Sequence, residues 1–214
     1  MGRRIVYYIP NNNQTLKVNL KKNFRDFKKW LTNKHKSDMR NWDESEISQI
    51  SFDQIQKVSN FEEFIQLPKQ NLDELVCNFV LDYCDLSNNG EKFYEIVYPM
   101  VNSWKYNGST QLINRNENIE VRKLWNYLDK GRSFQNDEPF TPIITSEEKI
   151  GFWSVQEQLI LKRELDIVYN KLNKDKTLRF LGNIDLLYGI ECVLQIIEAV
   201  KEFNVEIVIN KEEC

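Results

Sequence analysis

Strand-like segments lie near both ends of this sequence, and helical patterns fill most of the chain between them. Residues 3–9 (RRIVYYI) are rich in β-branched and aromatic side chains and precede Pro10, which is typical of a short strand that ends in a turn. Residues 205–209 (VEIVI) nearly alternate apolar positions and follow a long helical pattern, which predicts a second strand. Two such strands can share a sheet only if the chain folds back, so we expect them to pair or to be near neighbours.

The chain between these strands carries apolar residues at helical spacing. The predicted helices cover residues 20–31, one or two short stretches within 44–67, and residues 72–83, 93–104, 119–130, 154–172 and 184–203. Pro99 lies inside one of them and must either kink that helix or force an extended segment. The sequence therefore predicts an α+β fold that is mainly helical, with a small sheet that includes the N-terminal and C-terminal strands.

Several residues mark where these helices begin and end. Ser59 with Glu62, and Ser154 with Glu157, have the spacing of capping boxes, in which side chains satisfy the free backbone N–H groups of a first turn. Gly131 is predicted to close the helix over residues 119–130. Further breaks are predicted at Pro68, at the Asn107-Gly108 turn, and in a loop over residues 132–151 that contains Pro139 and Pro142.

Length and composition suit one domain. The 214 residues are 41% hydrophobic and 12% aromatic, enough for one sizeable core, and no Ser/Gly-rich or Pro-rich tract marks a linker, so we predict a single domain over residues 1–214. The apolar run at residues 5–9 is far shorter than the roughly 20 residues that span a bilayer. We expect a cytoplasmic protein with no membrane contact, whose four cysteines are reduced thiols without C-x-x-C spacing: Cys77, Cys84, Cys192 and Cys214.

Familiar catalytic motifs are missing from the sequence. His35 is the single histidine and lies between two lysines, which indicates a solvated side chain rather than a catalytic base or a metal ligand. The glycines are scattered singly, so neither a P-loop nor a dinucleotide fingerprint is present. Two carboxylate pairs have no accompanying third ligand, and we predict no catalytic residue, no metal site and no cofactor; the pairs are Asp82 with Asp85 and Glu147 with Glu148.

Charge is distributed unevenly along the chain. Residues 1–40 carry eleven Lys and Arg residues against two Asp residues, a net charge of +9, which leaves −12 for the remainder of a chain whose total is −3. Such asymmetry can mark a surface for nucleic acid or for an acidic partner, and packing of the basic helix against the acidic half of the chain would equally neutralise it. The predicted partner-binding residues are the cations of the helix over residues 20–31 and one aromatic anchor: Lys21, Lys22, Arg25, Lys28, Lys29 and Trp153.

A known family shares several short segments with this sequence, in the same order. They are Met1-Gly2 followed by residues 5–9 (IVYYI), residues 124–128 (LWNYL) with Gly131 and Phe134, residues 150–154 (IGFWS) with Glu157, and the closing helix with residues 205–209. Together they resemble the bacterial YfbM-like family of small uncharacterised α+β proteins. The resemblance covers about half of the chain and implies a fold, with residues of about 40–115 as a helical insertion or extension. It transfers no catalytic residue.

Three functional hypotheses follow. The preferred one is a non-catalytic cytoplasmic protein-binding domain, such as a bacterial immunity or antitoxin-like protein, because charge complementarity would speed the encounter with a partner protein. The first alternative is an enzyme of unfamiliar type whose carboxylates, Cys77 or Cys192, and a tyrosine share a pocket. The second is nucleic-acid association through the basic helix over residues 20–31, which salt would weaken steeply.

Overall fold

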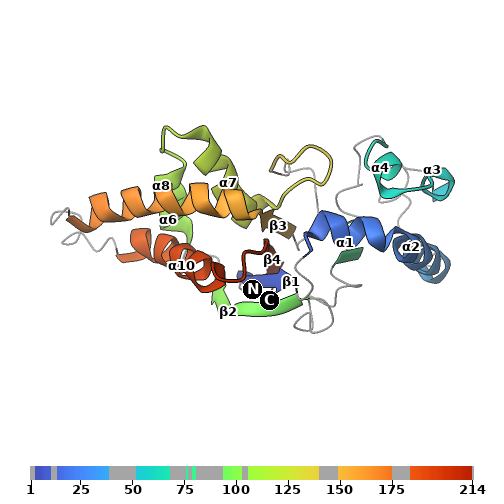
Figure 1. Ribbon diagram of the computed structural model, residues 1–214, viewed down its shortest axis with the longest axis horizontal. Helices are drawn as coiled ribbons and strands as arrows, with labels where there is room; N and C mark the ends of the chain where they lie inside the picture. Colours follow the sequence, from blue (N-terminus) through green and yellow to red (C-terminus); the bar gives the residue numbers. More distant parts are fainter. Residues whose placement is uncertain are drawn as a thin grey trace.

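The computed structural model describes residues 3–10, 14–38, 52–67, 76, 79–80, 94–102, 106–139, 149–174 and 184–213. Figure 1 shows a small sheet between two groups of helices, with α1 to α4 at one end and the later helices at the other. The prediction of a mainly helical α+β fold is confirmed. In chain order the elements are β1 (Arg3–Pro10), α1 (Leu16–Lys22), α2 (Phe24–Asp38), α3 (Phe52–Lys57), α4 (Phe61–Phe64), β2 (Tyr94–Asn102), α6 (Asn107–Ile113), α7 (Ile119–Lys130), β3 (Lys149–Trp153), α8 (Val155–Lys174), α10 (Ile184–Val200) and β4 (Ile207–Glu213).

The two terminal strands form the centre of the sheet. Within the described residues the strand order is β2-β1-β4-β3, and every neighbouring pair is antiparallel. β1 and β4 pair from Arg3 opposite Glu213 to Tyr8 opposite Val208. The prediction that the terminal strands pair is therefore confirmed.

β1 buries both of its faces, which explains its nearly continuous apolar sequence. Val6 and Tyr8 pack with side chains of α1, α2 and α4, whereas Ile5, Tyr7 and Ile9 pack with side chains of α7, α8 and α10. β4 follows the same alternation, because successive side chains of a strand point to opposite faces. One sheet thus separates two hydrophobic cores, each covered by its own helices.

β2 resolves the ambiguity at Pro99 in favour of an extended segment, so the helical interpretation of residues 93–104 is wrong. Tyr7 pairs with Tyr98 and Ile5 with Val101, so β2 holds an extra residue between these two pairs. Pro99 lies in this bulge, on a strand that pairs only with β1 among the described residues. Proline has no N–H group for a sheet ladder and is tolerated at edge strands and bulges.

The predicted helix over residues 20–31 is two helices, α1 and α2, that meet at Asn23. The backbone of Asn23 leaves the helical region at φ −99° and ψ 17°, and its side-chain amide donates a hydrogen bond of 2.9 Å to the Asn19 carbonyl. An asparagine side chain that competes for backbone carbonyls disfavours a helix interior. The break therefore redirects the chain after one short helix.

Predicted helix ends were right in two cases and shifted in one. Gly131 closes α7 with φ 73°, a region that favours glycine, and Ser154 with Glu157 forms the expected capping box at α8. The start of α4 is displaced by one residue, because Asn60 rather than Ser59 accepts the hydrogen bond from the backbone N–H three residues later.

Two local predictions were wrong. Asn107 and Gly108 begin α6 instead of a turn, and the predicted loop over residues 132–151 ends in β3, which starts at Lys149. The predicted helix over residues 72–83 lies largely outside the described residues. Val76, Phe79 and Val80 are described and are buried in the core that α1, α2 and α4 cover. The breaks at Pro68 and Pro142, and the acid pairs Asp82 with Asp85 and Glu147 with Glu148, also lie outside the described residues.

Within the described residues, no helix combines the length and the apolar character needed to cross a membrane.

Candidate functional site: a basic groove on α1 and α2

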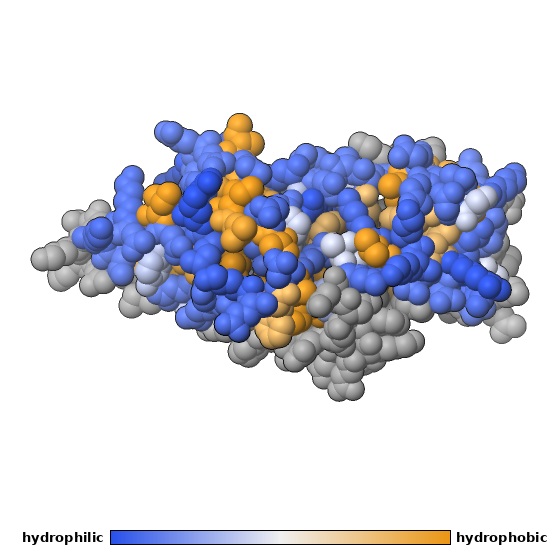
Figure 2. Space-filling model, in the orientation of Figure 1, coloured by the Kyte–Doolittle hydropathy of each residue, from blue (hydrophilic) through white to orange (hydrophobic). Residues whose placement is uncertain are grey.

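A groove of about 810 Å³ lies where the end of α1 and residues 24–33 of α2 face the segment from α3 to α4. We call it the basic groove, because the described residues of its lining include five cationic side chains and no carboxylate. Figure 2 shows that hydrophilic side chains cover most of α1 and α2 on the face in view. The lining residues are Lys21, Lys22, Phe24, Arg25, Lys28, Lys29, Thr32, Asn33, Gln56, Ser59 and Asn60.

Hydrophobic packing of α2 forms this groove. Phe24, Phe27 and Leu31 occupy one face of α2 and are buried, so the cations at the intervening positions point away from the core. The ring of Phe27 packs against that of Phe64 in α4, with the ring centroids 4.9 Å apart. This contact joins the two walls of the groove, which the sequence alone could not have indicated.

Lys28 is a structural cation within the groove. Its Nζ donates hydrogen bonds of 2.8 Å to the backbone carbonyls of Gln56 and Val58, at the end of α3. The last carbonyls of a helix have no partner within the helix and carry partial negative charge, so a lysine there stabilises the helix end. Lys28 therefore fixes α3 against α2 and is not available as a free charge.

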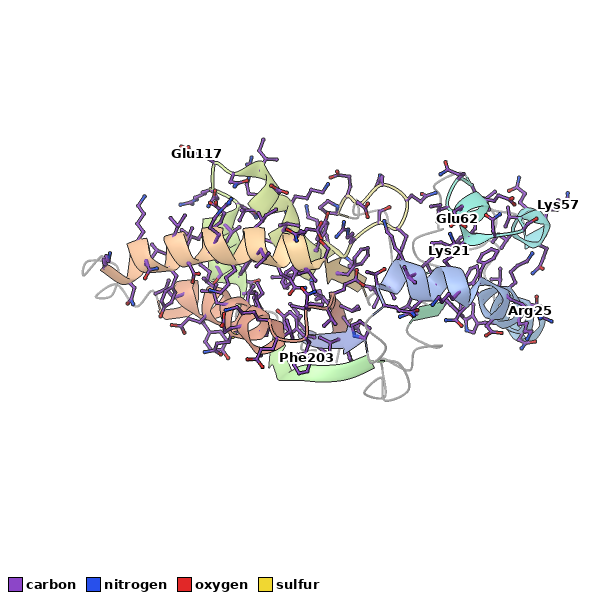
Figure 3. All side chains as sticks on the ribbon, viewed as in Figure 1. Lys21, Arg25, Lys57, Glu62, Glu117 and Phe203 are labelled. Atoms are coloured by element: carbon purple, nitrogen blue, oxygen red, sulfur yellow. The ribbon has the colours of Figure 1, made fainter. Side chains whose placement is uncertain are left out.

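Lys21 forms an ion pair with Glu62 of α4 across the groove rim (Figure 3). The hydrogen bond from Lys21 holds the pKa of Glu62 below its ordinary value. Both side chains are more than half exposed, and pairs of this kind contribute only about 0 to 1 kcal/mol. The pair is therefore a weak contact between α1 and α4.

The remaining cations are less engaged. Lys22 donates to the Gln14 side-chain oxygen at 2.9 Å, and Lys29 makes a long contact of 3.5 Å with Asp26. Arg25 is exposed and has no ion pair or hydrogen bond to the side chains described in this structure. A guanidinium in this state retains all five of its N–H donors for a ligand. The predicted partner-binding cations thus lie together, with Arg25, Lys22 and Lys29 the most available.

Trp153 corrects the sequence prediction, because it is not a surface anchor. Trp153 ends β3 and has no exposed area. Its ring packs against α7, where the indole N–H donates a hydrogen bond of 2.9 Å to the Leu124 carbonyl. A partner cannot contact a ring in this position. Trp153 is a core residue, as is its neighbour Phe152, which is 3% exposed.

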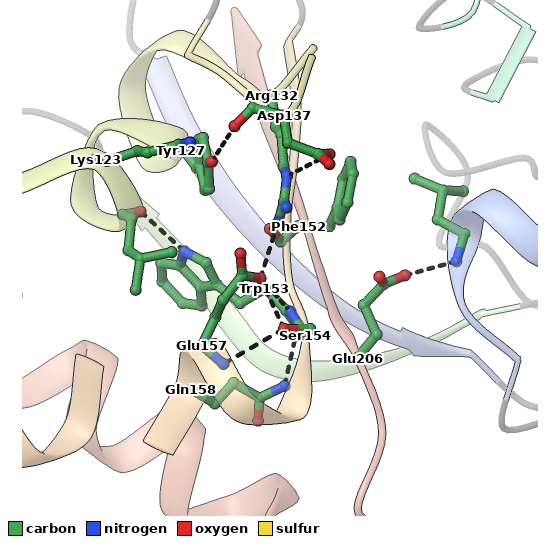
Figure 4. Close-up of polar contacts among 12 residues, drawn as sticks. Lys123, Tyr127, Arg132, Asp137, Phe152, Trp153, Ser154, Glu157, Gln158 and Glu206 are labelled. Carbon is green, nitrogen blue, oxygen red and sulfur yellow. Dashed lines mark hydrogen bonds and ion pairs between the residues drawn. The ribbon is translucent and has the colours of Figure 1, made fainter. Parts of the chain in front are cut away.

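A second polar cluster surrounds Arg132 and was not predicted from the sequence (Figure 4). The guanidinium carbon lies 4.8 Å from the ring centroid of Tyr127 and 4.3 Å from that of Phe152. Nη1 donates to Glu157 Oε2 at 2.8 Å, and Nε donates to Asp137 Oδ1 at 3.2 Å. Burial lowers the pKa of Arg132, but the hydrogen bond to Glu157 and the nearby charges of Glu157 and Asp137 act together against burial, and the pKa is raised overall. Each ring and carboxylate named in the cluster already contacts Arg132. The cluster therefore fixes β3 against α8, and we call it the Arg132 lock.

Glu206 lies buried just before β4, with 6% of its surface exposed. The backbone N–H of Leu16 donates to its Oε1 at 2.6 Å, a contact that is drawn in Figure 4. Burial raises the pKa of Glu206 to about 7, although this hydrogen bond and the charges of Arg132 and Lys17 act in the opposite direction. The carboxyl group joins the start of α1 to the sheet and so positions the helices that carry the basic groove.

Cys192, which the enzyme hypothesis named, is packed into the core, and so are the tyrosines Tyr7 and Tyr106. Cys192 is 3% exposed, and the hydroxyl groups of Tyr7 and Tyr106 lie 2.8 Å apart. Burial raises the pKa of both phenols, so they remain protonated and do not provide a base. Cys77 and the side chain of His35 lie outside the described residues. Within the parts of the chain that the structure describes, no group of His, Cys, Asp and Glu side chains is arranged to hold a metal ion.

No protein-family model, no curated protein and no solved structure matches this chain. The resemblance to the YfbM-like family therefore remains a prediction from the sequence.

Proposed function

We propose that this chain is a non-catalytic protein-binding domain whose basic groove contacts an acidic region of a partner protein. The observation that carries the proposal is the lining of the groove, where the part of the chain that the structure describes contributes five cations and no carboxylate. Like charges held close together repel one another, and an oppositely charged surface relieves this repulsion on binding.

The specific form that we propose is an immunity or antitoxin-like protein, which occludes a toxin. Such a protein acts by binding alone, so it needs a charged recognition surface and a stable scaffold but no reactive side chain. The Arg132 lock and the two cores supply that scaffold, and the basic groove supplies the charged surface.

Crosslinking in the source cells, followed by mass spectrometry, tests the proposal. The chain would be compared with a groove variant carrying Lys22→Glu, Arg25→Glu and Lys29→Glu. A matched control carries Arg115→Glu, Lys171→Glu and Lys201→Glu, which reverse three exposed charges outside the groove lining. Lys201 pairs with Glu198 three residues away, as Lys29 pairs with Asp26. The control variant therefore also loses one exposed ion pair of this kind.

We expect one protein to be captured by the wild-type chain and by the control variant, and to be absent with the groove variant. Equal capture by all three chains would contradict the groove as the binding surface. For the immunity form, the captured protein should arrest growth when expressed alone, and the chain should restore growth. A captured protein that does no harm would overturn the immunity form while leaving protein binding in place.

A further inference from the structure

Glu62 is a carboxylate that the chain itself presents beside the basic groove. It reaches from α4 to Lys21, a lining residue, whereas the lining contains no acid among the residues that the structure describes. Because the pair is exposed on both sides, another carboxylate can replace Glu62 at little cost. The contact between Lys21 and Glu62 therefore shows which chemical group the groove accepts.

We propose that the basic groove receives an acidic peptide segment of the partner, and that Glu62 competes with this segment for Lys21. This inference rests on the proposed function and specifies the ligand of the same site. In the bound state a carboxylate of the segment takes the place of Glu62, while Arg25, Lys22 and Lys29 bind further carboxylates.

The spacing of the cations suits an extended peptide. Arg25 and Lys29 lie four residues apart on α2, which places them on one side of that helix about 6 Å apart, and Lys22 lines the same groove from the end of α1, beyond the break at Asn23. In an extended peptide, side chains two residues apart point the same way at about 7 Å. Two or three acidic residues at alternate positions therefore cover the row of cations, and Arg25 can bind one carboxylate with two parallel hydrogen bonds.

The polar wall opposite the cations favours a peptide over a nucleic acid. The side-chain amides of Gln56 and Asn60 already bond to Thr32 and Glu63, and each amide nitrogen has a second N–H group that can donate to the backbone of a peptide, as can the hydroxyl group of Ser59. Binding of single-stranded nucleic acid relies on exposed aromatic rings that stack on bases. The aromatic ring that lines the groove is that of Phe24, which is 5% exposed and engaged with Phe61 and Phe64.

Fluorescence anisotropy with a labelled octaglutamate peptide tests this inference on the full chain. A labelled octauridylate RNA of the same length serves as the competing ligand. The variants are Arg25→Gln with Lys29→Gln, the control Arg115→Gln with Lys201→Gln, and Glu62→Gln. Thermal unfolding of each variant checks that it folds, and Arg25→Gln alone serves if the double variant does not.

We expect the peptide to bind the wild-type chain, and to bind about tenfold or more weakly to the groove variant, since two charge-assisted contacts are lost. The control should stay within about twofold of the wild type. Glu62→Gln should tighten binding by about two- to fivefold, because Lys21 is released from its internal partner. Raising the salt concentration should weaken binding in each case.

Four results would overturn the inference. If the groove variant and the control variant lose affinity for the peptide equally, the overall charge of the chain alone attracts the peptide. Tighter binding of the RNA than of the peptide at the same salt concentration would identify the groove as a nucleic-acid site. If Glu62→Gln binds the peptide as well as or more weakly than the wild type, Glu62 does not compete with the peptide for Lys21. If the peptide fails to bind while the groove variant still loses the partner in crosslinking, the acidic-segment inference falls and the proposed function stands.

Discussion

Replacing Glu206 with Gln tests whether the buried carboxyl group costs stability once it ionises. The side chain keeps its size, and its amide oxygen can still accept the hydrogen bond from the Leu16 backbone N–H. The substitution therefore removes the charge and little else. We expect the variant to be more stable than the wild type at neutral and higher pH.

The magnitude follows from the pKa of Glu206, which burial raises from an ordinary 4.5 to about 7. Between these two values the folded chain holds a proton that the unfolded chain has released, so the free energy of unfolding falls as pH rises through this window. The full shift corresponds to about 3 kcal/mol. Below pH 4.5 both proteins should have equal stability, and above about pH 8 the variant should be more stable by up to about 3 kcal/mol.

Urea denaturation followed by circular dichroism over this pH range measures the difference directly. The carboxyl groups whose pKa is lowered, Asp129 and Asp137 among them, are present in both proteins and cancel in the comparison. Glu202→Gln is the matched control, because Glu202 lies four residues earlier and is exposed. A Glu206→Gln variant that is less stable than wild type at pH 8 would refute the reasoning. It would mean that attraction by Arg132 and Lys17 outweighs burial.

Two further substitutions probe the packing that shapes the groove and the sheet. Lys28→Ala should lower the free energy of unfolding by about 1 to 2 kcal/mol, because it removes both hydrogen bonds to the end of α3. Lys29→Ala, whose long contact is exposed, should change it by less than about 0.5 kcal/mol, and equal effects in urea denaturation would contradict the role given to Lys28. Gly151→Ala should cost about 1 to 3 kcal/mol, since a Cβ there would lie 2.5 Å from the Tyr127 carbonyl oxygen. Gly108→Ala in α6 should be neutral or stabilising by up to about 1 kcal/mol, and a Gly151→Ala melting temperature equal to that of wild type would contradict the close approach of β3 and α7.

The sequence predicted those elements whose residues carry a complete local signal. α7 combines an apolar stripe with a closing glycine, and residues 5–9 of β1 are all β-branched or aromatic. β3 was missed because five residues after a loop are too few to show a periodic pattern. Pro99 left two structures open, and only the pairing of β2 with β1 decided between them.

The candidate site was predictable in its charges but not in their roles. The cations of α1 and α2 are visible in the sequence, yet Lys28 is used by carbonyls 28 and 30 residues away. Glu206 precedes a strand and gives no sign of burial, because its partner Leu16 is 190 residues distant. Trp153 was misassigned for the same reason, since burial depends on contacts between distant segments.

Photo-crosslinking from inside the basic groove tests the central claim most directly. A photoreactive amino acid would replace Asn33, an exposed residue of the groove lining, and in a second chain it would replace Asn170, which is exposed on α8. The account predicts an adduct from position 33 only, joined to a peptide of the partner that is rich in Asp and Glu. Adducts from position 170 alone, or equal yields from both positions, would contradict it.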